Sequence, residues 1–481
     1  MQFSFRDKKI FKGNSMRLIS TKRNILIVIL SVFSMASLAA DKSYERSAFM
    51  HQGEETTDDP RRVPVPAGYG DHDTVLVLVG GRVLDGTGAE ARDATVVTQG
   101  KKIAAILELG NSQYPEGAQI IDISGKTIMP GLIELHSHLT YAEADPALAE
   151  NLSDGALRGV ERLRYYLESG ITTVRDVASQ NDAIFRLKDW VNAGKVPGPR
   201  IYAAGQLIVG KGGHGSEGNY HTAPGVPQSA IREASGVDDW REAVREQFKN
   251  GADLIKLASH YSPEEIKAAV DEAHRLGLRV TVDAETHYVA MAVQAGVDSV
   301  EHPLPRSDKT IRLMAKKGIA SVPTIVPYDI IMDEWKGYYG STSRRFSLNK
   351  DTTRDMLKKL HQGGVKLGIA TDLVAHWFRY LPQPYIAELK TFVETLAYTP
   401  AEALVAATRT NAEILGMEDK LGTLEQGKLA DLLVINGNPD QNLDDLAKVD
   451  MVIRDGRVAV KNGQVVVSRH KPVPMPKSGD N

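Results

Sequence analysis

Eight short apolar runs alternate with amphipathic stretches through the middle of this 481-residue chain. Several of the amphipathic stretches, such as EEIKAAVDEAHRLG and THYVAMAVQAG, end in glycine, as helices often do. Repeated strand–helix units predict an α/β fold in which parallel strands close into a (β/α)8 TIM-like barrel. A doubly wound open sheet is the alternative, but eight parallel strands close more readily. The runs are residues 127–139, 171–179, 200–208, 252–259, 278–284, 297–303, 318–326 and 365–372.

Glycine-punctuated β patterns flank this middle region on both sides. VLVLVGGRVLDG, ATVVTQGKKIAAILELG and AQIIDISGKTI precede it, and LADLLVING and VDMVIRDGRVAVKNGQVVV follow it. Glycines between β-branched runs are typical of turns between antiparallel strands. We therefore expect one small β-sandwich domain built from both chain ends, at residues 73–127 and 418–472, beside a barrel at residues 128–417.

The first 40 residues have the layout of a secretory signal peptide. Lys22 and Arg23 precede an apolar run that starts at Ile25, and Ser37 and Ala39 fit a cleavage site. The apolar run is short for a membrane span, which needs about 20 residues. We expect a periplasmic or secreted protein with no stable span after cleavage; an uncleaved anchor is the alternative. Residues 41–72, rich in Pro, Asp and Glu, predict a polar extension.

The composition excludes several classes of function. Lys plus Arg number 58 against 61 Asp plus Glu, a net charge of -3, so no strong field attracts nucleic acid. The chain has no cysteine, which excludes disulfides, thiolate metal sites and a cysteine nucleophile. Charged residues at 25% and hydrophobic ones at 42% are typical of an ordinary globular protein.

Residues that bind metals stand where four of the predicted strands end. His136 and His138 alternate along a strand, so both imidazoles face one side, where they suit a zinc-class ion. Lys256 lies inside apolar LIKLA, where a charged lysine is costly unless it is paired or neutral. His302 and Asp372 stand at the ends of the sixth and eighth runs. Since barrels of this kind place their chemistry at the C-terminal strand ends, we predict one shared site.

Nine motifs in a fixed order identify a family resemblance. They are IMPGLIELHSHL, GITTVRDV, GPRIYAAG, GGHG, GADLIKL, AGVDSVEHP, ATD, TPAEALVAATRTNAEILG and GTLEQGKLADLLVINGNP. With these motifs the chain resembles the amidohydrolase superfamily, in its imidazolonepropionase-like branch that includes Xaa-Pro dipeptidases. The resemblance covers roughly residues 74–470.

The resemblance implies a metal centre with two divalent ions, zinc or alternatively manganese. It implies that His136 and His138 bind the first ion, that a carbamylated Lys256 bridges both ions, and that His302 binds the second. Asp372 would hold the first ion, accept a proton from the activated water and pass it to the leaving amine.

Three further side chains lie in or near the predicted site. The resemblance implies that His214, in GGHG, contacts substrate, although a turn histidine fits nearly as well. Tyr141 could donate to a substrate oxygen or simply pack. Arg175 is expected to be structural and paired with Asp176 or another acid.

Asp283 marks a departure from the family pattern. The branch has a histidine here, in a segment like VHAET, whereas this chain has VDAET. Asp283 as a carboxylate ligand of the second ion is the first interpretation, and it would favour a harder ion such as manganese. A weak or empty second site, and a structural Asp283 in a protein without hydrolytic activity, are the other two.

These observations predict a metal-dependent amidohydrolase that cleaves amide or peptide bonds of dipeptides or N-acyl amino acids. A cyclic amide hydrolase, a deaminase and a non-catalytic metal-binding homologue are the alternatives, and Lys256 argues against the deaminase. The expected partner is a small-molecule or peptide substrate, and we expect a homo-oligomer.

Overall fold

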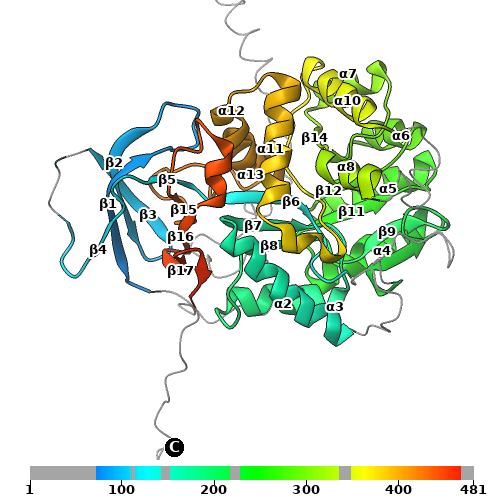
Figure 1. Ribbon diagram of the computed structural model, residues 1–481. Helices are drawn as coiled ribbons and strands as arrows, with labels where there is room; N and C mark the ends of the chain where they lie inside the picture. Colours follow the sequence, from blue (N-terminus) through cyan, green and yellow to red (C-terminus); the bar gives the residue numbers. More distant parts are fainter. Residues whose placement is uncertain are drawn as a thin grey trace, which may run out of the picture.

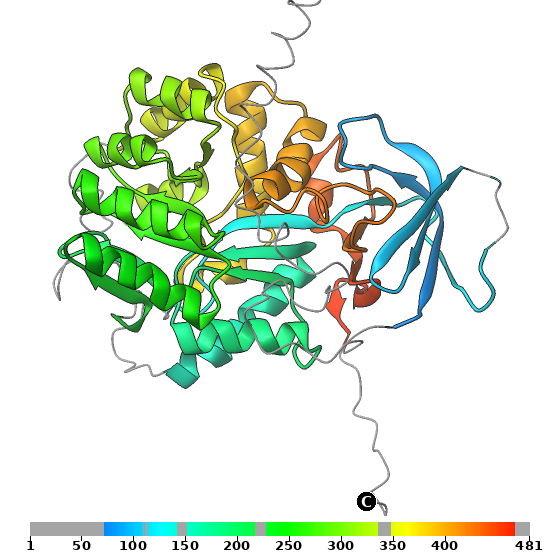
Figure 2. The ribbon, with the colours of Figure 1, turned by 180° about the vertical axis from the view of Figure 1, so that it is seen from behind.

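The computed structural model describes residues 72–108, 110, 114–141, 152–216, 228–334 and 348–466. The predicted signal peptide and all of the polar extension except His72 lie outside these residues. None of the helices in the described part combines the length and apolar composition that a membrane crossing requires. A β-sheet occupies one side of the molecule, and a larger region of strands and helices occupies the other (Figures 1 and 2).

A nine-stranded sheet combines strands from both ends of the described chain, at the left in Figure 1. Its strands are β1 (Val75–Val83), β2 (Arg92–Gln99), β3 (Lys102–Glu108), β4 (Gln119–Asp122), β5 (Thr127–Pro130), β15 (Leu432–Ile435), β16 (Val449–Arg454), β17 (Arg457–Lys461) and β18 (Gln464–Val465). β5 pairs antiparallel with β15, so Ile128 lies opposite Val434. Leu78, Val96 and Ile453 belong to a separate apolar core of this sheet. Its division into the two layers of a sandwich stays a prediction, as do the domain boundaries.

Parallel strands fill the first seven predicted apolar runs, which confirms the mixed α/β class. These strands are β6 (Leu132–Ser137), β7 (Ile171–Asp176), β8 (Arg200–Ala203), β11 (Leu254–Ala258), β12 (Arg279–Asp283), β13 (Ser299–Glu301) and β14 (Ala320–Val322). Two more strands, β9 (Leu207–Gly210) and β10 (Ile231–Ala234), extend the set. They form two sheets, ordered β6-β7-β8 and β10-β9-β11-β12-β13-β14. Closure into one barrel stays a prediction.

The eighth run, residues 365–372, makes one isolated bridge, from Leu367 to Ser321 of β14, and the next residue, Leu373, bridges to Ser137 of β6. Side chains take the place of a strand ladder here. Asn411 accepts a hydrogen bond from the Ile369 N–H at 2.9 Å and donates to the Ile369 carbonyl at 2.8 Å. Glu134 accepts from the Thr371 N–H at 3.0 Å. Because these side chains satisfy buried backbone groups, the run holds its position without forming a regular strand.

Helices surround the parallel strands on the side away from the nine-stranded sheet (Figure 2). α5 shows how the sequence starts them: Ser262 accepts from the Glu265 N–H in a capping box, and Pro263 occupies the first turn. The helices are α2 (Leu152–Glu168), α3 (Asn181–Asn192), α4 (Val237–Asn250), α5 (Pro263–Arg275), α6 (His287–Ala295), α7 (Asp308–Lys317), α8 (Ile325–Glu334), α10 (Lys350–Gln362), α11 (Gln383–Leu396), α12 (Pro400–Val405) and α13 (Asn411–Leu415). Short 3₁₀ helices are η2 (Gln228–Ala230), η3 (Ala375–Tyr380) and η5 (Leu443–Ala447), and η4 (Ala406–Thr410) is a π-helical segment between α12 and α13.

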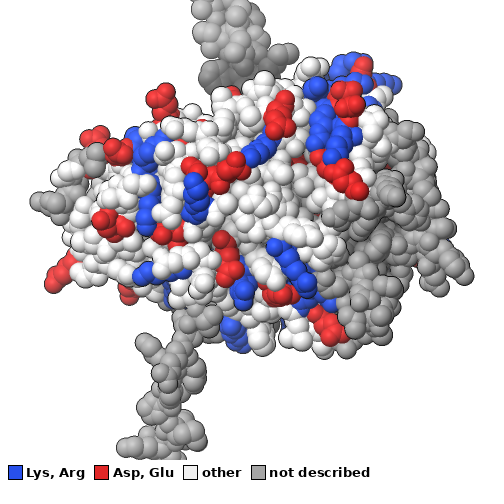
Figure 3. Space-filling model, viewed as in Figure 1, with Lys and Arg blue, Asp and Glu red and all other residues white. Residues whose placement is uncertain are grey.

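Acidic and basic side chains are interspersed on the face shown in Figure 3, with white surface between them. This mixture agrees with the small net charge of -3. Among the described residues, this face offers no single-sign field of the kind that steers a polyanion.

Candidate metal centre and active site

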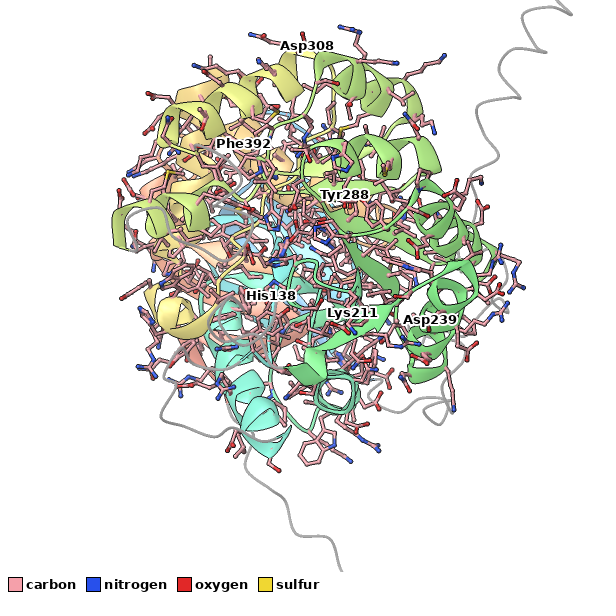
Figure 4. The ribbon with its side chains drawn as sticks, turned by 90° about the vertical axis from the view of Figure 1, so that its right-hand side faces the viewer. His138, Lys211, Asp239, Tyr288, Asp308 and Phe392 are labelled. Carbon is pink, nitrogen blue, oxygen red and sulfur yellow. The ribbon has the colours of Figure 1, made fainter. Side chains whose placement is uncertain are left out.

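The C-terminal ends of the parallel strands meet at one cavity. In Figure 4 the labelled His138 lies toward the middle of the molecule, whereas Asp239 and Asp308 lie at its edge. The cavity is lined by His136, His138, Tyr141, Ala178, Leu207, His214, Lys256, Asp283, His302, Tyr328, Ile331 and Asp372. The structure thus brings together every position predicted to bind metal or substrate. Their individual roles stay predictions.

His136, His138 and Asp372 form a compact cluster of potential ligands. One ligand atom from each lies within 4.8 Å of the others. The Asp372 Oδ1 atom is 3.4 Å from the Nε2 atom of His136 and 3.2 Å from that of His138. Such separations suit atoms that share one ion with bonds of about 2.0–2.2 Å.

Hydrogen bonds on the far side of each ring orient these imidazoles. The Nδ1 atom of His136 lies 2.8 Å from Glu301 Oε2, and that of His138 lies 3.0 Å from the Ala178 carbonyl oxygen. A proton on each Nδ1 leaves each Nε2 lone pair facing Asp372. This arrangement of carboxylate or carbonyl, imidazole and ligand position is common at metal sites because it fixes the tautomer.

The protonation states of the cluster also favour a cation. Burial, together with the charge of Lys256, lowers the pKa of His136 to about 3, so this ring is neutral at physiological pH. Burial alone would raise the pKa of Asp372, but the nearby His136, His138 and His302 lower it below its usual range. Neutral imidazoles and an ionised carboxylate are the forms that bind a divalent ion. The residues present therefore fit the metal that the sequence predicts.

Lys256 lies in the middle of β11 and is only 2% exposed. Burial disfavours its ammonium form more strongly than the nearby Glu301, Asp283 and Asp372 favour it. Burial lowers its pKa, which increases the fraction of neutral amine. A neutral amine is the form that reacts with carbon dioxide, so its surroundings are compatible with a carbamate.

Asp283 ends β12 and points into the same cavity. Its Oδ2 atom lies 3.2 Å from His302 Nε2 and 3.7 Å from His214 Nε2. Burial alone would raise its pKa, but His302, His214 and Lys256 lower it well below the usual range. Asp283 is thus an ionised carboxylate at the position where the family pattern has a histidine.

Backbone strain accompanies the potential ligands. His302 has φ 64° and Asp372 has φ 44°, although neither residue is glycine. Thr324, whose Oγ1 atom lies 2.8 Å from His302 Nδ1, has φ 46°. Left-handed non-glycine residues are uncommon and cluster at functional sites, where the surrounding structure enforces them.

Tyr141 and His214 also line the cavity. The Tyr141 ring stacks on His138, with centroids 4.2 Å apart and an interplanar angle of 12°. His214 sits on a loop whose backbone packs on the segment after β11, because its N–H donates to the Ser259 carbonyl at 3.1 Å. A Cβ at Gly213 would lie 1.6 Å from the same carbonyl oxygen, which explains the glycine there.

Several buried polar residues behind the site were not assigned roles from the sequence. Glu301, fully buried, contacts both His136 and Arg175, the latter at 2.7 Å. Arg175 is thus paired with an acid other than Asp176. Burial raises the pKa of Glu134 to about 8, and Glu134 accepts from the backbone beside His136. The only sequence signal for these acids is a carboxylate inside an apolar run.

Comparisons with known proteins agree with this geometry. A sequence model of the amidohydrolase family matches residues 127–459. The structure of a prolidase in complex with N-methylphosphonate-L-proline superposes with a TM-score of 0.73 and 30% identity, covering 81% of this chain and 100% of that one. The structure of a Xaa-Pro dipeptidase with methionine in its active site superposes with a TM-score of 0.70 and 27% identity, covering 80% of this chain and 99% of that one. The ochratoxinase of Aspergillus niger is 26% identical over 422 residues, 80% of this chain and 85% of that enzyme. The imidazolonepropionase of Desulfotalea psychrophila is 25% identical over 387 residues, 72% and 84% of the respective chains.

Proposed function

Because this chain belongs to the amidohydrolase family and is therefore a hydrolase of carbon–nitrogen bonds, we propose that it cleaves the amide bond of dipeptides or N-acyl amino acids with bound divalent metal ions. The observation that carries this proposal is the cluster of His136, His138 and Asp372, which lines the same cavity as the buried Lys256. A purely structural role could account for any one of these residues, but it does not account for all four lining one cavity.

Each residue receives a role from its position. His136, His138 and Asp372 would hold one ion, and Asp283 and His302 the other, with carbamylated Lys256 between them. Zinc is our first choice, and the carboxylate of Asp283 leaves manganese open for the second position. When bound, such ions polarise the amide carbonyl and lower the pKa of a water molecule.

The chain's own groups then move the proton. Ionised Asp372 accepts a proton from the attacking water and donates it to the departing amine nitrogen. The water oxygen joins the acyl carbon as the C–N bond breaks, and the amine leaves with the transferred proton. Tyr141 and His214, which line the same cavity, would contact the substrate oxygen or its terminal carboxylate.

The dipeptide substrate class is supported by the structural relatives. The prolidase binds N-methylphosphonate-L-proline and the Xaa-Pro dipeptidase binds methionine in its active site. A phosphonate has the tetrahedral shape of a hydrated amide carbonyl, which is the shape that a hydrolase must stabilise. We therefore place proline-containing dipeptides first among candidate substrates.

A cyclic amide is the second candidate substrate, because the imidazolonepropionase of Desulfotalea psychrophila aligns with 72% of this chain. A non-catalytic metal-binding protein is the third possibility, since Asp283 departs from the family's ligand pattern. A cyclic amide hydrolase would open the ring of its substrate, whereas a non-catalytic protein would bind metal without turnover.

A substrate screen separates these possibilities. The purified chain, loaded with zinc or manganese, is incubated with dipeptides, N-acyl amino acids and cyclic amides, and products are measured by mass spectrometry. Release of free amino acids supports the proposal, ring opening alone supports the second candidate, and no turnover at full metal content contradicts both. His136→Ala should abolish activity, whereas His376→Ala, in η3 and outside the cavity lining, should preserve it.

Further parts of the proposal concern the whole molecule. We propose that the parallel strands form one closed (β/α)8 barrel beside a β-sandwich, with boundaries near residues 128 and 418. We also propose export through the N-terminal signal, and a homo-oligomer. Cell fractionation tests the export, and light scattering on the purified chain tests the oligomer.

A further inference from the structure

One wall of the cavity is carried by α8, which begins directly after β14. This helix supplies Tyr328 and Ile331 to the lining. The Tyr328 ring lies edge-on to His302, with centroids 5.7 Å apart. Thr324, immediately before the helix, contacts His302 Nδ1 at 2.8 Å. The start of α8 therefore determines the placement of both a predicted ligand and a cavity wall.

The N-terminus of α8 is held by a carboxylate from a different helix. Glu388, on α11, accepts from the Ile325 N–H at 2.9 Å and from the Val326 N–H at 2.8 Å. The first N–H groups of a helix have no partner within it, so the two oxygens of the Glu388 carboxyl group satisfy two of them. Burial raises the pKa of this carboxyl group to about 8, although both N–H groups lower it. Glu388 thus supplies, from about 60 residues away in sequence, what a local cap supplies elsewhere.

Burial makes this contact unusual. Glu388 is 0% exposed, and a buried carboxyl group is costly unless its acceptors are used. Both of its oxygens are used, on two successive backbone N–H groups that follow Thr324 directly. Thr324 has a left-handed φ of 46°, a conformation that the residues on either side must enforce.

A second tie to the same helix lies one turn further along. Asp329 forms a two-pronged ion pair with Arg354 of α10, and this pair is partly exposed. It holds the body of α8 but does not touch the backbone next to Thr324. The Arg354–Asp329 pair therefore anchors the helix as a whole, whereas Glu388 fixes the backbone of its first residues.

We propose that Glu388 is a positioning residue of the active site: by fixing the first two N–H groups of α8 it orients Thr324, and through Thr324 the His302 imidazole. This inference rests on the proposed function, because it assigns His302 to the metal centre. Glu388 does not line the cavity, so it acts only through this chain of contacts.

Glu388→Gln tests the chain of contacts, because its amide has one acceptor oxygen and turns an N–H₂ group toward the second helix N–H. Loss of groups behind metal ligands typically costs 10- to 100-fold in metal affinity, and we expect a loss within that range at the position that includes His302. Asp329→Asn is the matched control; it loosens the same helix and should change metal affinity less than about twofold.

The readout is titration of the full-length chain with cobalt(II), whose visible absorption reports the geometry of its ligands, alongside thermal unfolding of the metal-free protein. We expect a changed cobalt spectrum in Glu388→Gln and a wild-type spectrum in Asp329→Asn. Thr324→Val removes only the hydroxyl and should reproduce the spectrum of Glu388→Gln; the double variant should add little to either single one.

A wild-type cobalt spectrum and affinity in Thr324→Val would overturn the inference, even if Glu388→Gln failed to fold. Independent, multiplying losses in the double variant would overturn it as well. These readouts need no substrate, so they remain decisive if the wild-type chain hydrolyses no amide, a result that would contradict the proposed function alone.

Discussion

Replacement of Asp283 tests whether a carboxylate serves the second metal position. Asp283 Oδ2 lies 3.2 Å from His302 Nε2 and 3.7 Å from His214 Nε2, and the residue is 6% exposed. Asp283→Ala removes a negatively charged ligand from the second position. We expect it to cost at least the 10- to 100-fold in metal affinity that loss of a residue behind a ligand typically costs.

Asp283→His should act in the opposite direction for zinc. An imidazole restores the donor of the family pattern and removes a negative charge, so preference should move from manganese toward zinc. Metal content after dialysis, measured by mass spectrometry, and binding calorimetry with each ion give the two quantities. Asp298→Ala is the matched control, because Asp298 is half-buried and also pairs with a histidine, His274, at 2.9 Å, but does not line the cavity.

The control should lose stability and keep its metal content. If Asp283→Ala and Asp283→His both retained the metal count and affinities of the wild type, Asp283 would not be a ligand. The second position would then depend on His302 without it, and the chain would be reinterpreted as binding one ion.

Three other predictions follow from single side chains. Lys256→Met should abolish hydrolysis yet stabilise the metal-free chain by about 1–3 kcal/mol, measured by urea unfolding, because burial disfavours the lysine ammonium more strongly than the nearby carboxylates favour it; a less stable variant would show that the attraction of Glu301, Asp283 and Asp372 outweighs burial. Asp372→Asn should lower kcat about 100- to 10,000-fold while one metal ion stays bound, since the proton acceptor is lost; normal turnover would exclude it as the base. Burial raises the pKa of Asp176 to about 8, so the folded chain keeps a proton that the unfolded chain releases near pH 4. Its contribution to stability therefore falls as pH rises from about 4 to 8, by at most about 1.4 kcal/mol per pH unit, and Asp176→Asn should remove that slope; parallel curves for both proteins would contradict the shift.

The local sequence pattern of apolar residues was sufficient to locate most of the parallel strands along the chain. Alternation placed His136 and His138 on one face, and the apolar runs located seven parallel strands because a strand buried on both faces needs such a run. Asp283 was placed correctly at a strand end for the same reason. β9 and β10 were not predicted as separate strands, because four residues carry too little periodicity to distinguish a strand.

Long-range contacts between side chains and backbone could not be read from the sequence. The eighth run is held by Glu134, 237 residues away from Thr371, rather than by a regular ladder. Glu301 and Arg175 are 126 residues apart and meet only in the folded chain. Nothing in the pattern around Glu388 indicates that its carboxylate caps a helix about 60 residues earlier. Periodicity reports which face is buried, but it does not report which buried polar groups find one another.

Hydrolysis in ¹⁸O-labelled water tests the central claim most directly. The full-length chain, with metal and after chelation, is incubated with a proline-containing dipeptide, and the released amino acids are analysed by mass spectrometry. With proline as the C-terminal residue of the dipeptide, we predict that the metal-loaded chain releases unlabelled proline and places one ¹⁸O atom in the carboxylate of the other amino acid, and that chelation stops both. A metal-loaded chain with intact His136, His138 and Asp372 that releases no amino acid from any dipeptide or N-acyl amino acid would contradict the proposed function.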